Sequence, residues 1–167
     1  MNIKKSIPWL LLAALIFVMP LSSCNAFEWR TDLAAAASDA QTGQKLILLN
    51  FSGSDWCGWC KRLDAEVFST SEFKDYAAAN LVCVIADFPR GTKLPPALQA
   101  QNERLMRAFR VEGFPTILVF NSAAELIGQL GYQPGGPAAF INSLKQVQAR
   151  AAMRPAGSPA GPKLPLE

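Results

Sequence analysis

The 167-residue chain contains no histidine. This absence excludes histidine as a general acid or base, the Ser-His-Asp and Cys-His nucleophile arrangements, and every zinc site with a histidine ligand. Charged residues make up only 17% of the chain, and the net charge is +3. Because no dense run of Lys and Arg follows the Lys4–Lys5 pair, we expect no nucleic-acid partner.

Cysteine is also scarce, with four residues in the chain. Two of them, Cys57 and Cys60, lie close together in "SGSDWCGWCKRL". The others are Cys24, near the N-terminus, and Cys83, isolated in an apolar run. A four-ligand zinc site is therefore poorly supported. A redox pair, a two-thiolate Cu(I) site and a purely structural disulfide remain open for Cys57 and Cys60.

The first residues are typical of an export signal. Two lysines precede an apolar stretch over residues 7–21, and small residues follow. The apolar stretch is shorter than the roughly 20 residues that a spanning helix needs. We predict a signal peptide over residues 1–23, with an uncleaved anchor helix as the alternative.

The end of this signal resembles the bacterial lipobox. In "LSSC", residues 21–24, cleavage before Cys24 would leave its sulfur to receive a lipid. The alternative is ordinary cleavage after Ala26. Either route leads to a compartment in which disulfides persist, so we expect a periplasmic or other extracytoplasmic protein, attached to a membrane through a lipid on Cys24.

The C-terminal residues 153–167 are rich in proline, glycine and alanine. Such a composition is typical of a disordered tail. We therefore predict one folded domain over residues 27–152, which is a length that can bury a proper core.

Strand and helix patterns alternate along this domain. Helices are predicted over residues 33–41, 60–68, 71–77, 98–111 and 137–148, and strands over 45–51, 81–88, 115–120 and 125–132. Thr31 or Asp32 can cap the first helix, and Gly43 lies past its end. A capping box at Ser69–Glu72 begins the third helix. The last two strands form a hairpin. The expected fold class is α/β, with a mixed central sheet flanked by helices.

The position of the cysteine pair favours redox chemistry. Cys57 follows a buried strand and precedes a helix, where unpaired backbone N–H groups stabilise a thiolate. Cys60 lies one turn further along, so the two sulfurs can bond. One cysteine can attack a substrate disulfide, and the other can resolve the mixed disulfide.

Two segments in the right order resemble the thioredoxin superfamily, especially its secreted bacterial single-domain members: "DWCGWCK" after the first strand, and "VEGFPTILVF" before the hairpin. The resemblance implies a thioredoxin-like fold, with Cys57 as the nucleophile and Cys60 as the resolving cysteine. It also implies a cis peptide bond before Pro115, and a substrate surface formed by Trp56, Trp59, Phe114 and Pro115. Packing roles are the alternative for these four.

The chain also departs from this family pattern. Asn50 stands where thioredoxin has a buried aspartate, and Cys83 is the predicted counterpart of the lysine beside it. Asparagine accepts no proton, so the resolving thiol must lose its proton elsewhere. Gly58 and Trp59 separate the cysteines, whereas strong oxidants have a histidine there, which favours a reductant.

Together these observations predict a thiol–disulfide oxidoreductase. It would reduce exported proteins that contain disulfides, be reset by a membrane redox partner, and need no cofactor or metal. An oxidase or isomerase with the same residues, a Cu(I)-binding module, and an interaction domain with vestigial cysteines are the competing hypotheses.

Overall fold

The structure is a computed structural model that describes residues 27–155 and 157–166. The predictions for residues 1–23, Cys24 and Ala26 lie outside the described residues. Within the described part of the chain, no helix has the length and apolar character needed to cross a membrane.

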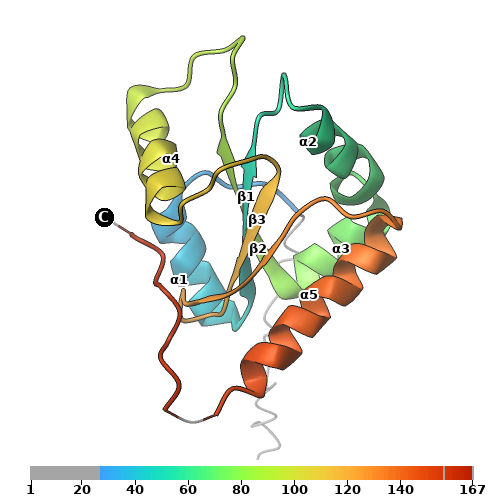
Figure 1. Ribbon diagram of the computed structural model, residues 1–167, viewed down its shortest axis with the longest axis vertical. Coiled ribbons are helices and arrows are strands. Elements are labelled where there is room, and N and C mark those ends of the chain that lie inside the picture. The colour runs from blue at the N-terminus through green and yellow to red at the C-terminus, as the bar shows by residue number, and fades with distance from the viewer. Residues whose placement is uncertain (1–26, 156, 167) are drawn as a thin grey trace, which may run out of the picture.

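A four-stranded mixed sheet forms the centre of the domain (Figure 1). Its strands lie in the order β2-β1-β3-β4. The strands are β1 (Leu46–Ser52), β2 (Leu81–Asp87), β3 (Thr116–Phe120) and β4 (Leu126–Leu130). β1 runs parallel to β2 and antiparallel to β3, and β3 pairs antiparallel with β4. The predicted mixed sheet and its closing hairpin are confirmed.

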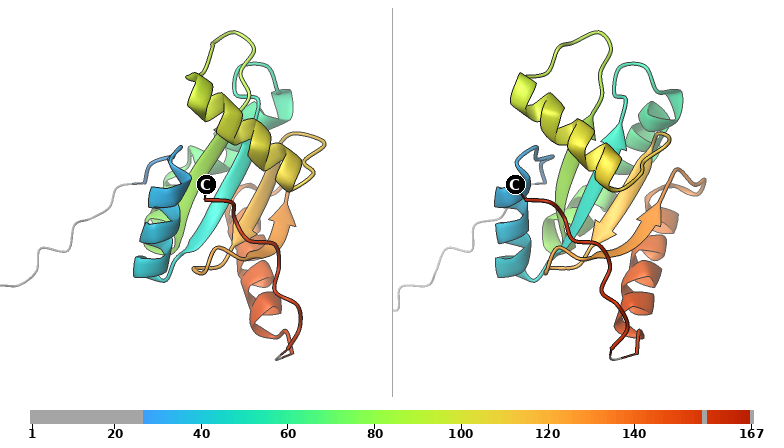
Figure 2. Two further views of the ribbon diagram at one scale, coloured as in Figure 1. Left: turned by 90° about the vertical axis from the view of Figure 1, so that its left-hand side faces the viewer. Right: turned by 60° about the vertical axis from the view of Figure 1, so that its left-hand side comes forward.

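Helices cover both faces of this sheet (Figure 2). One face carries α1 (Leu33–Gly43) and α4 (Pro96–Ala108), and the other carries α2 (Gly58–Leu63), a π-helical turn η1 (Asp64–Phe68), α3 (Ser71–Asn80) and α5 (Gly136–Ala152). The predicted helix over residues 60–68 is therefore an α-helical turn that changes to π-helix at Asp64.

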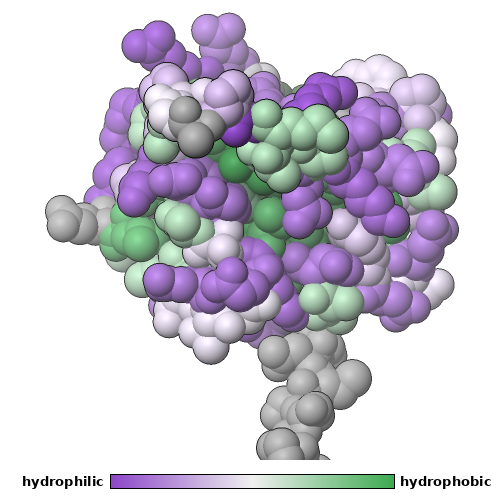
Figure 3. Space-filling view, turned by 90° about the horizontal axis from the view of Figure 1, so that it is seen from below, coloured by the Kyte–Doolittle hydropathy of each residue, from purple (hydrophilic) through white to green (hydrophobic). Residues whose placement is uncertain are grey.

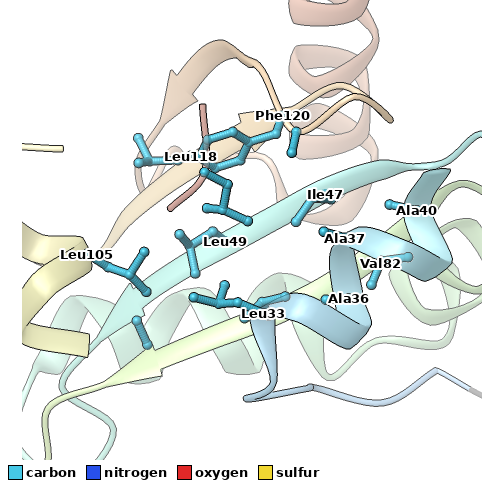
Figure 4. Close-up of a cluster of buried hydrophobic side chains, with 14 of the residues drawn as sticks. Leu33, Ala36, Ala37, Ala40, Ile47, Leu49, Val82, Leu105, Leu118 and Phe120 are labelled. Carbon is cyan, nitrogen blue, oxygen red and sulfur yellow. The ribbon is translucent and has the colours of Figure 1, made fainter. Parts of the chain in front are cut away.

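β1 is buried along its whole length, as its apolar sequence predicts. Its side chains alternate between the two faces. Ile47, Leu49 and Phe51 belong to the core beneath α1 and α4, of which Figure 4 shows the first two. Leu46 and Leu48 join the opposite core, where the strand ends in the buried polar residues Asn50 and Ser52.

Several helix ends differ from the prediction by one or two residues. The Asp32 carboxylate caps α1 by accepting from the Ala35 N–H at 3.0 Å. Gly43 is still helical, and Gln44 adopts the left-handed φ of 51° instead. Thr70, not Ser69, caps α3, by accepting from the Phe73 N–H. α4 begins two residues earlier than predicted because Pro96 suits the first helical position.

The C-terminal segment is not the disordered tail that its composition predicts. It returns along the α1 and α4 side of the sheet (Figure 2), where Leu164 is 4% exposed within the core. The Leu126 N–H donates to the Pro162 carbonyl at 3.0 Å, and the Leu164 N–H donates to Ala124 at 2.9 Å. A proline-rich segment can pair here because β4 is an edge strand and proline carbonyls still accept hydrogen bonds.

Candidate active site

Cys57 and Cys60 form a disulfide at the start of α2, with a Cα–Cα distance of 5.2 Å. Cys57 caps the helix, and its sulfur accepts a hydrogen bond from the Cys60 N–H at 3.2 Å. The backbone N–H of Cys57 donates to the Gly53 carbonyl at 2.8 Å, which fixes the entry of the chain into the helix. The Cys60 N–H, which contacts the Cys57 sulfur in the disulfide, would stabilise the Cys57 thiolate after reduction.

The two cysteines have different surroundings although they are equally buried, at 7% and 6% exposed. Cys60 lines a cavity of about 290 Å³ behind the disulfide, together with Asn50 of β1. Cys57 lies at the helix start, next to the exposed Trp56. Cys60 therefore contacts the cavity, whereas Cys57 forms the N-cap of α2.

Two aspartates fasten the loop before the disulfide to the loop after β2. The Asp55 carboxylate accepts from the N–H groups of Arg90 and Gly91, the latter at 2.6 Å. These hydrogen bonds, from Gly91 first and Arg90 second, lower the pKa of Asp55. Asp87 accepts from both the N–H and the hydroxyl of Ser54, at 2.9 and 2.6 Å. Asp55 is thus a structural turn residue, held at the site's edge.

Trp56 lies on one side of the disulfide and is 37% exposed. Its indole N–H donates to the Phe88 carbonyl at 2.8 Å, and its ring meets that of Phe114 edge-on at 5.9 Å. The Arg90 guanidinium lies 3.9 Å from the indole centroid. The ring also lies so close to Gly53 that a Cβ there would approach it to 2.4 Å. Trp56 is consequently held in one orientation.

Trp59 lies between the cysteines in sequence and is 55% exposed. Its ring packs at 5.0 Å from that of Tyr132, and the Arg62 guanidinium lies over both rings, at 5.6 and 5.2 Å. Glu66 completes this group by accepting from Arg62 Nε at 2.7 Å and from the Tyr132 hydroxyl at 2.8 Å. These contacts hold the exposed Trp59 ring in place beside the disulfide.

These contacts also shift the ionisation of the charged members of the group. Hydrogen bonds from Arg62 and Tyr132 lower the pKa of Glu66. The bond to Glu66 in turn raises the pKa of Arg62 and of Tyr132. All three groups therefore keep their hydrogen-bonded charge states near neutral pH.

Two of the four exposed large apolar side chains in the described residues lie at this site. In the described residues the four are Trp56, Trp59, Met153 and Leu166, and the last two belong to the C-terminal segment. The opposite end of the molecule, seen from below in Figure 3, is mostly hydrophilic with scattered apolar patches. An apolar surface around a reactive group is typical of a binding site.

The second predicted segment contributes Phe114 and Pro115. The peptide bond between them is cis, as the resemblance implies. Phe114 is half-buried and stacks on Phe88 at 5.2 Å while it contacts Trp56. The fold thus brings Phe114 to the motif from a segment more than fifty residues away in sequence.

Asn50 and Cys83 occupy different positions relative to the Cys57–Cys60 disulfide. Asn50 is 6% exposed and shares the cavity with Cys60. Ile85 is its partner on β2 and also lines the cavity, whereas Cys83 pairs with Leu48. The neighbour of Asn50 on β2 is therefore Ile85, and not Cys83 as predicted. Burial raises the pKa of the Cys83 thiol, which makes it inert.

Metal ligands are sparse around the site. Across residues 27–155 and 157–166, no group of three or more Cys, Asp, Glu or His side chains is placed to hold an ion. A Cu(I) ion would have to use the reduced sulfurs of Cys57 and Cys60 as a two-thiolate site.

Sequence reasoning missed the residues that support the two tryptophans. Arg62 and Glu66 were detectable as an i, i+4 pair on a helix. Arg90 and Tyr132 reach the site only through the tertiary fold, so no local pattern could have identified them.

Comparison with known proteins agrees with this geometry. Residues 33–148 match the family described as a thioredoxin-like domain. The chain is 32% identical to Disulfide bond reductase DsbH of Chlamydia pneumoniae over 126 residues, 75% of each protein. It is 25% identical to Thioredoxin-related protein DsbJ of the same organism, and this match covers 72% of the chain but 37% of DsbJ.

Solved structures give the same result. The structure titled DsbH Oxidoreductase matches with a TM-score of 0.69 and 27% identity, over 92% of this chain and 95% of the other. A thioredoxin from Thermus thermophilus matches with a TM-score of 0.55 and 22% identity, over 75% and 90% of the two chains. The second likeness is evidence for the fold alone.

Proposed function

This chain belongs to the thioredoxin-like family, and we propose that it reduces disulfides of other exported proteins through Cys57 and Cys60. The observation that carries the proposal is the disulfide at the start of α2, bordered by two exposed tryptophans. This is a bond that can be opened and closed at a surface able to bind a polypeptide.

The reaction follows from the positions of the two sulfurs. The reduced Cys57 thiolate, stabilised by the Cys60 N–H, attacks one sulfur of a client disulfide and releases the other as a thiolate. Cys60 then loses its proton and attacks Cys57. The second client sulfur leaves, and the Cys57–Cys60 bond forms. Two electrons have moved from the pair to the client.

Trp56, Trp59, Phe114 and Pro115 are the proposed substrate surface. The exposed indoles of Trp56 and Trp59 supply apolar contact area on either side of the cysteines. Because the surrounding contacts already fix both rings, binding costs them little conformational entropy.

Two observations support the direction of electron flow. No histidine lies between the cysteines to stabilise a thiolate there, and a relative with 32% identity carries the name of a reductase. A reductant in an oxidising compartment must be reset, so the proposal includes a membrane redox partner that donates electrons to the Cys57–Cys60 disulfide.

The location rests on the N-terminal sequence. We propose that residues 1–23 direct export and that Cys24 receives a lipid, which places the domain at a membrane surface. Metabolic labelling with palmitate tests this directly. The label should enter the wild-type protein and be lost in Cys24→Ser, whereas cleavage after Ala26 would leave both proteins unlabelled.

The experiment that tests the catalytic proposal traps the intermediate. With Cys60→Ala, Cys57 can still attack insulin but nothing resolves the mixed disulfide, so a covalent complex that thiols can reverse should accumulate. Cys57→Ala is the matched control, because it also keeps one cysteine of the pair and should trap nothing.

Other outcomes would favour the competing functions. Absence of trapping, combined with stoichiometric Cu(I) binding that Cys60→Ala abolishes, would support a copper-binding module. Trapping combined with net oxidation of reduced client proteins would support an oxidase.

A further inference from the structure

The cavity behind the disulfide is bounded by β1 on one side and by α2 and η1 on the other. Its volume of about 290 Å³ is room for several waters at about 30 Å³ each. Asn50 and Ser52 line it from the strand, and Cys60, Lys61 and Asp64 line it from the helix. The cavity therefore contacts the cysteine whose proton must leave before the mixed disulfide is resolved.

Asn50 gives this cavity a buried polar wall. Its side chain is 94% buried, and its Oδ1 has no hydrogen-bond partner among the residues that the structure describes. A buried carbonyl oxygen without a partner is costly. Because the cavity is roomy and also lined by the Ser52 hydroxyl and the Asp64 carboxylate, a water bound to Asn50 Oδ1 has the polar partners that it needs.

Asp64 connects the same cavity to solvent. Its backbone N–H donates to the Cys60 carbonyl, so the two residues are one helical turn apart and share a side of the helix. The π-helical turn begins at Asp64, and the Ser69 hydroxyl, from the end of that turn, donates to Asp64 Oδ2 at 2.9 Å. The carboxylate is thus held at the exposed rim of a cavity that has Cys60 in its wall.

Two charged residues line the cavity, Lys61 and Asp64. The Lys61 ammonium donates to the Asp55 carbonyl at 2.7 Å, in the loop before the disulfide. Asn50 is an amide and cannot accept a proton. Asp64 is consequently the one cavity-lining group in the described structure with a carboxylate to receive a proton from Cys60.

We propose that Asp64 accepts the proton of the Cys60 thiol through a water held by Asn50. This inference rests on the proposed reductase function and concerns its second step. The Cys60 proton passes to the bridging water as that water gives a proton to Asp64. The Cys60 thiolate attacks Cys57, the Cys57–client bond breaks, the client leaves as a thiolate, and Asp64 later releases its proton to solvent.

Single-turnover reaction of the reduced protein with 5,5′-dithiobis(2-nitrobenzoate) separates the two steps. Cys57 attack releases one coloured thiolate, and Cys60 attack on the resulting mixed disulfide releases the second. In Asp64→Asn at neutral pH, the first phase should keep its rate and the second should slow by about a hundredfold, the lower end of the range of general-base effects.

The sign of this change distinguishes proton transfer from simple electrostatics. Removal of a nearby negative charge lowers the pKa of the Cys60 thiol, which by itself would accelerate the second phase. Titration of Cys60 in a Cys57→Ala background should show this lower pKa in Asp64→Asn. A second phase that is unchanged or faster, or a first phase slowed equally, overturns the inference.

A second variant tests the water independently. Asn50→Leu has a similar volume but cannot hold a water, so it should also slow the second phase while leaving the first unchanged. An unchanged second phase in Asn50→Leu would overturn the role of the cavity.

One control addresses surface charge. Asp75→Asn removes an exposed carboxylate from α3 and should leave the two phases unchanged. If it reproduces the effect of Asp64→Asn, the slow step reflects surface charge, and the inference fails.

The failure of this inference differs from the failure of the proposed function. If the wild-type protein releases no coloured thiolate, or if Cys60→Ala traps no insulin, the reductase proposal fails. If the wild-type protein completes both phases and Asp64→Asn does too at the same rate, only the proton-transfer role fails.

Discussion

The two faces of β1 differ although they belong to one strand. Toward α1 and α4 the strand presents Ile47, Leu49 and Phe51, each 0% exposed and apolar. Toward α2 it changes from Leu48 to Asn50 and Ser52 as it approaches the disulfide. The first face is packed for stability, whereas the second gives up apolar packing in favour of a polar cavity. Cys60 lies against the second.

The largest expected change in stability comes from a substitution on the apolar face of β1. Phe51→Ala should destabilise the oxidised protein by about 4 kcal/mol, because it removes a fully buried aromatic ring and leaves a cavity. Urea denaturation measures this loss, and Phe51→Leu, which refills most of the space, should lose clearly less. Equal stability of wild type and Phe51→Ala would contradict the assignment of this face to the core.

The next effect concerns the C-terminal segment, which extends the same apolar face. Leu164→Ala should cost about 2 kcal/mol in the same experiment, since the side chain is 4% exposed within the core. The neighbouring Lys163→Ala is exposed and serves as the control. A loss below about 0.5 kcal/mol, typical of a surface position, would show that the segment is the disordered tail predicted from its composition.

A substitution on the polar face of β1 should stabilise the protein instead of destabilising it. Asn50→Leu should stabilise the protein by about 1 kcal/mol, because it replaces a buried amide, whose oxygen has only the proposed water as a partner, by an apolar group of similar volume and releases that water to solvent. Denaturation midpoints of the oxidised wild type and variant give the difference. Destabilisation comparable to that of Leu164→Ala would show that Asn50 supports the fold and would remove the contrast between the faces.

The smallest effect is pH-dependent and lies outside the cavity, in the group around Trp59. Hydrogen bonds from Arg62 and Tyr132 lower the pKa of Glu66 in the folded protein. A lowered folded pKa means that the stabilisation is complete above the ordinary carboxyl value of about 4.3 and is lost as pH falls through the folded value.

Glu66→Gln should therefore be slightly less stable than wild type at neutral pH, and this difference should shrink as pH falls below the carboxyl range. Thermal denaturation of both proteins across that range measures it. A difference that stays constant with pH would show that the Glu66 charge contributes nothing.

Much of this arrangement was predictable from the sequence. The apolar run of β1 predicted a buried strand, and the spacing of Cys57 and Cys60 at a helix start predicted sulfurs within bonding range. Both features depend on local residue types. The cis bond before Pro115 was implied by the resemblance to the thioredoxin superfamily.

Other features depend on contacts between distant segments. Arg90 and Tyr132 reach the tryptophans from loops after β2 and β4. Leu164 enters the core because β4 leaves an edge on which its segment can pair. Asp64 and Phe68 of η1 also line the polar cavity, and no local sequence pattern predicted the change to π-helix at Asp64.

The reduction potential of the Cys57–Cys60 pair distinguishes a disulfide reductant from a disulfide donor. Equilibration of the protein with dithiothreitol and glutathione buffers, with the thiols quantified by alkylation, gives this value. We expect a reversible two-electron couple near the roughly −270 mV of thioredoxin. A potential near about −120 mV would make the protein a disulfide donor, and the absence of any reversible couple would contradict the oxidoreductase function itself.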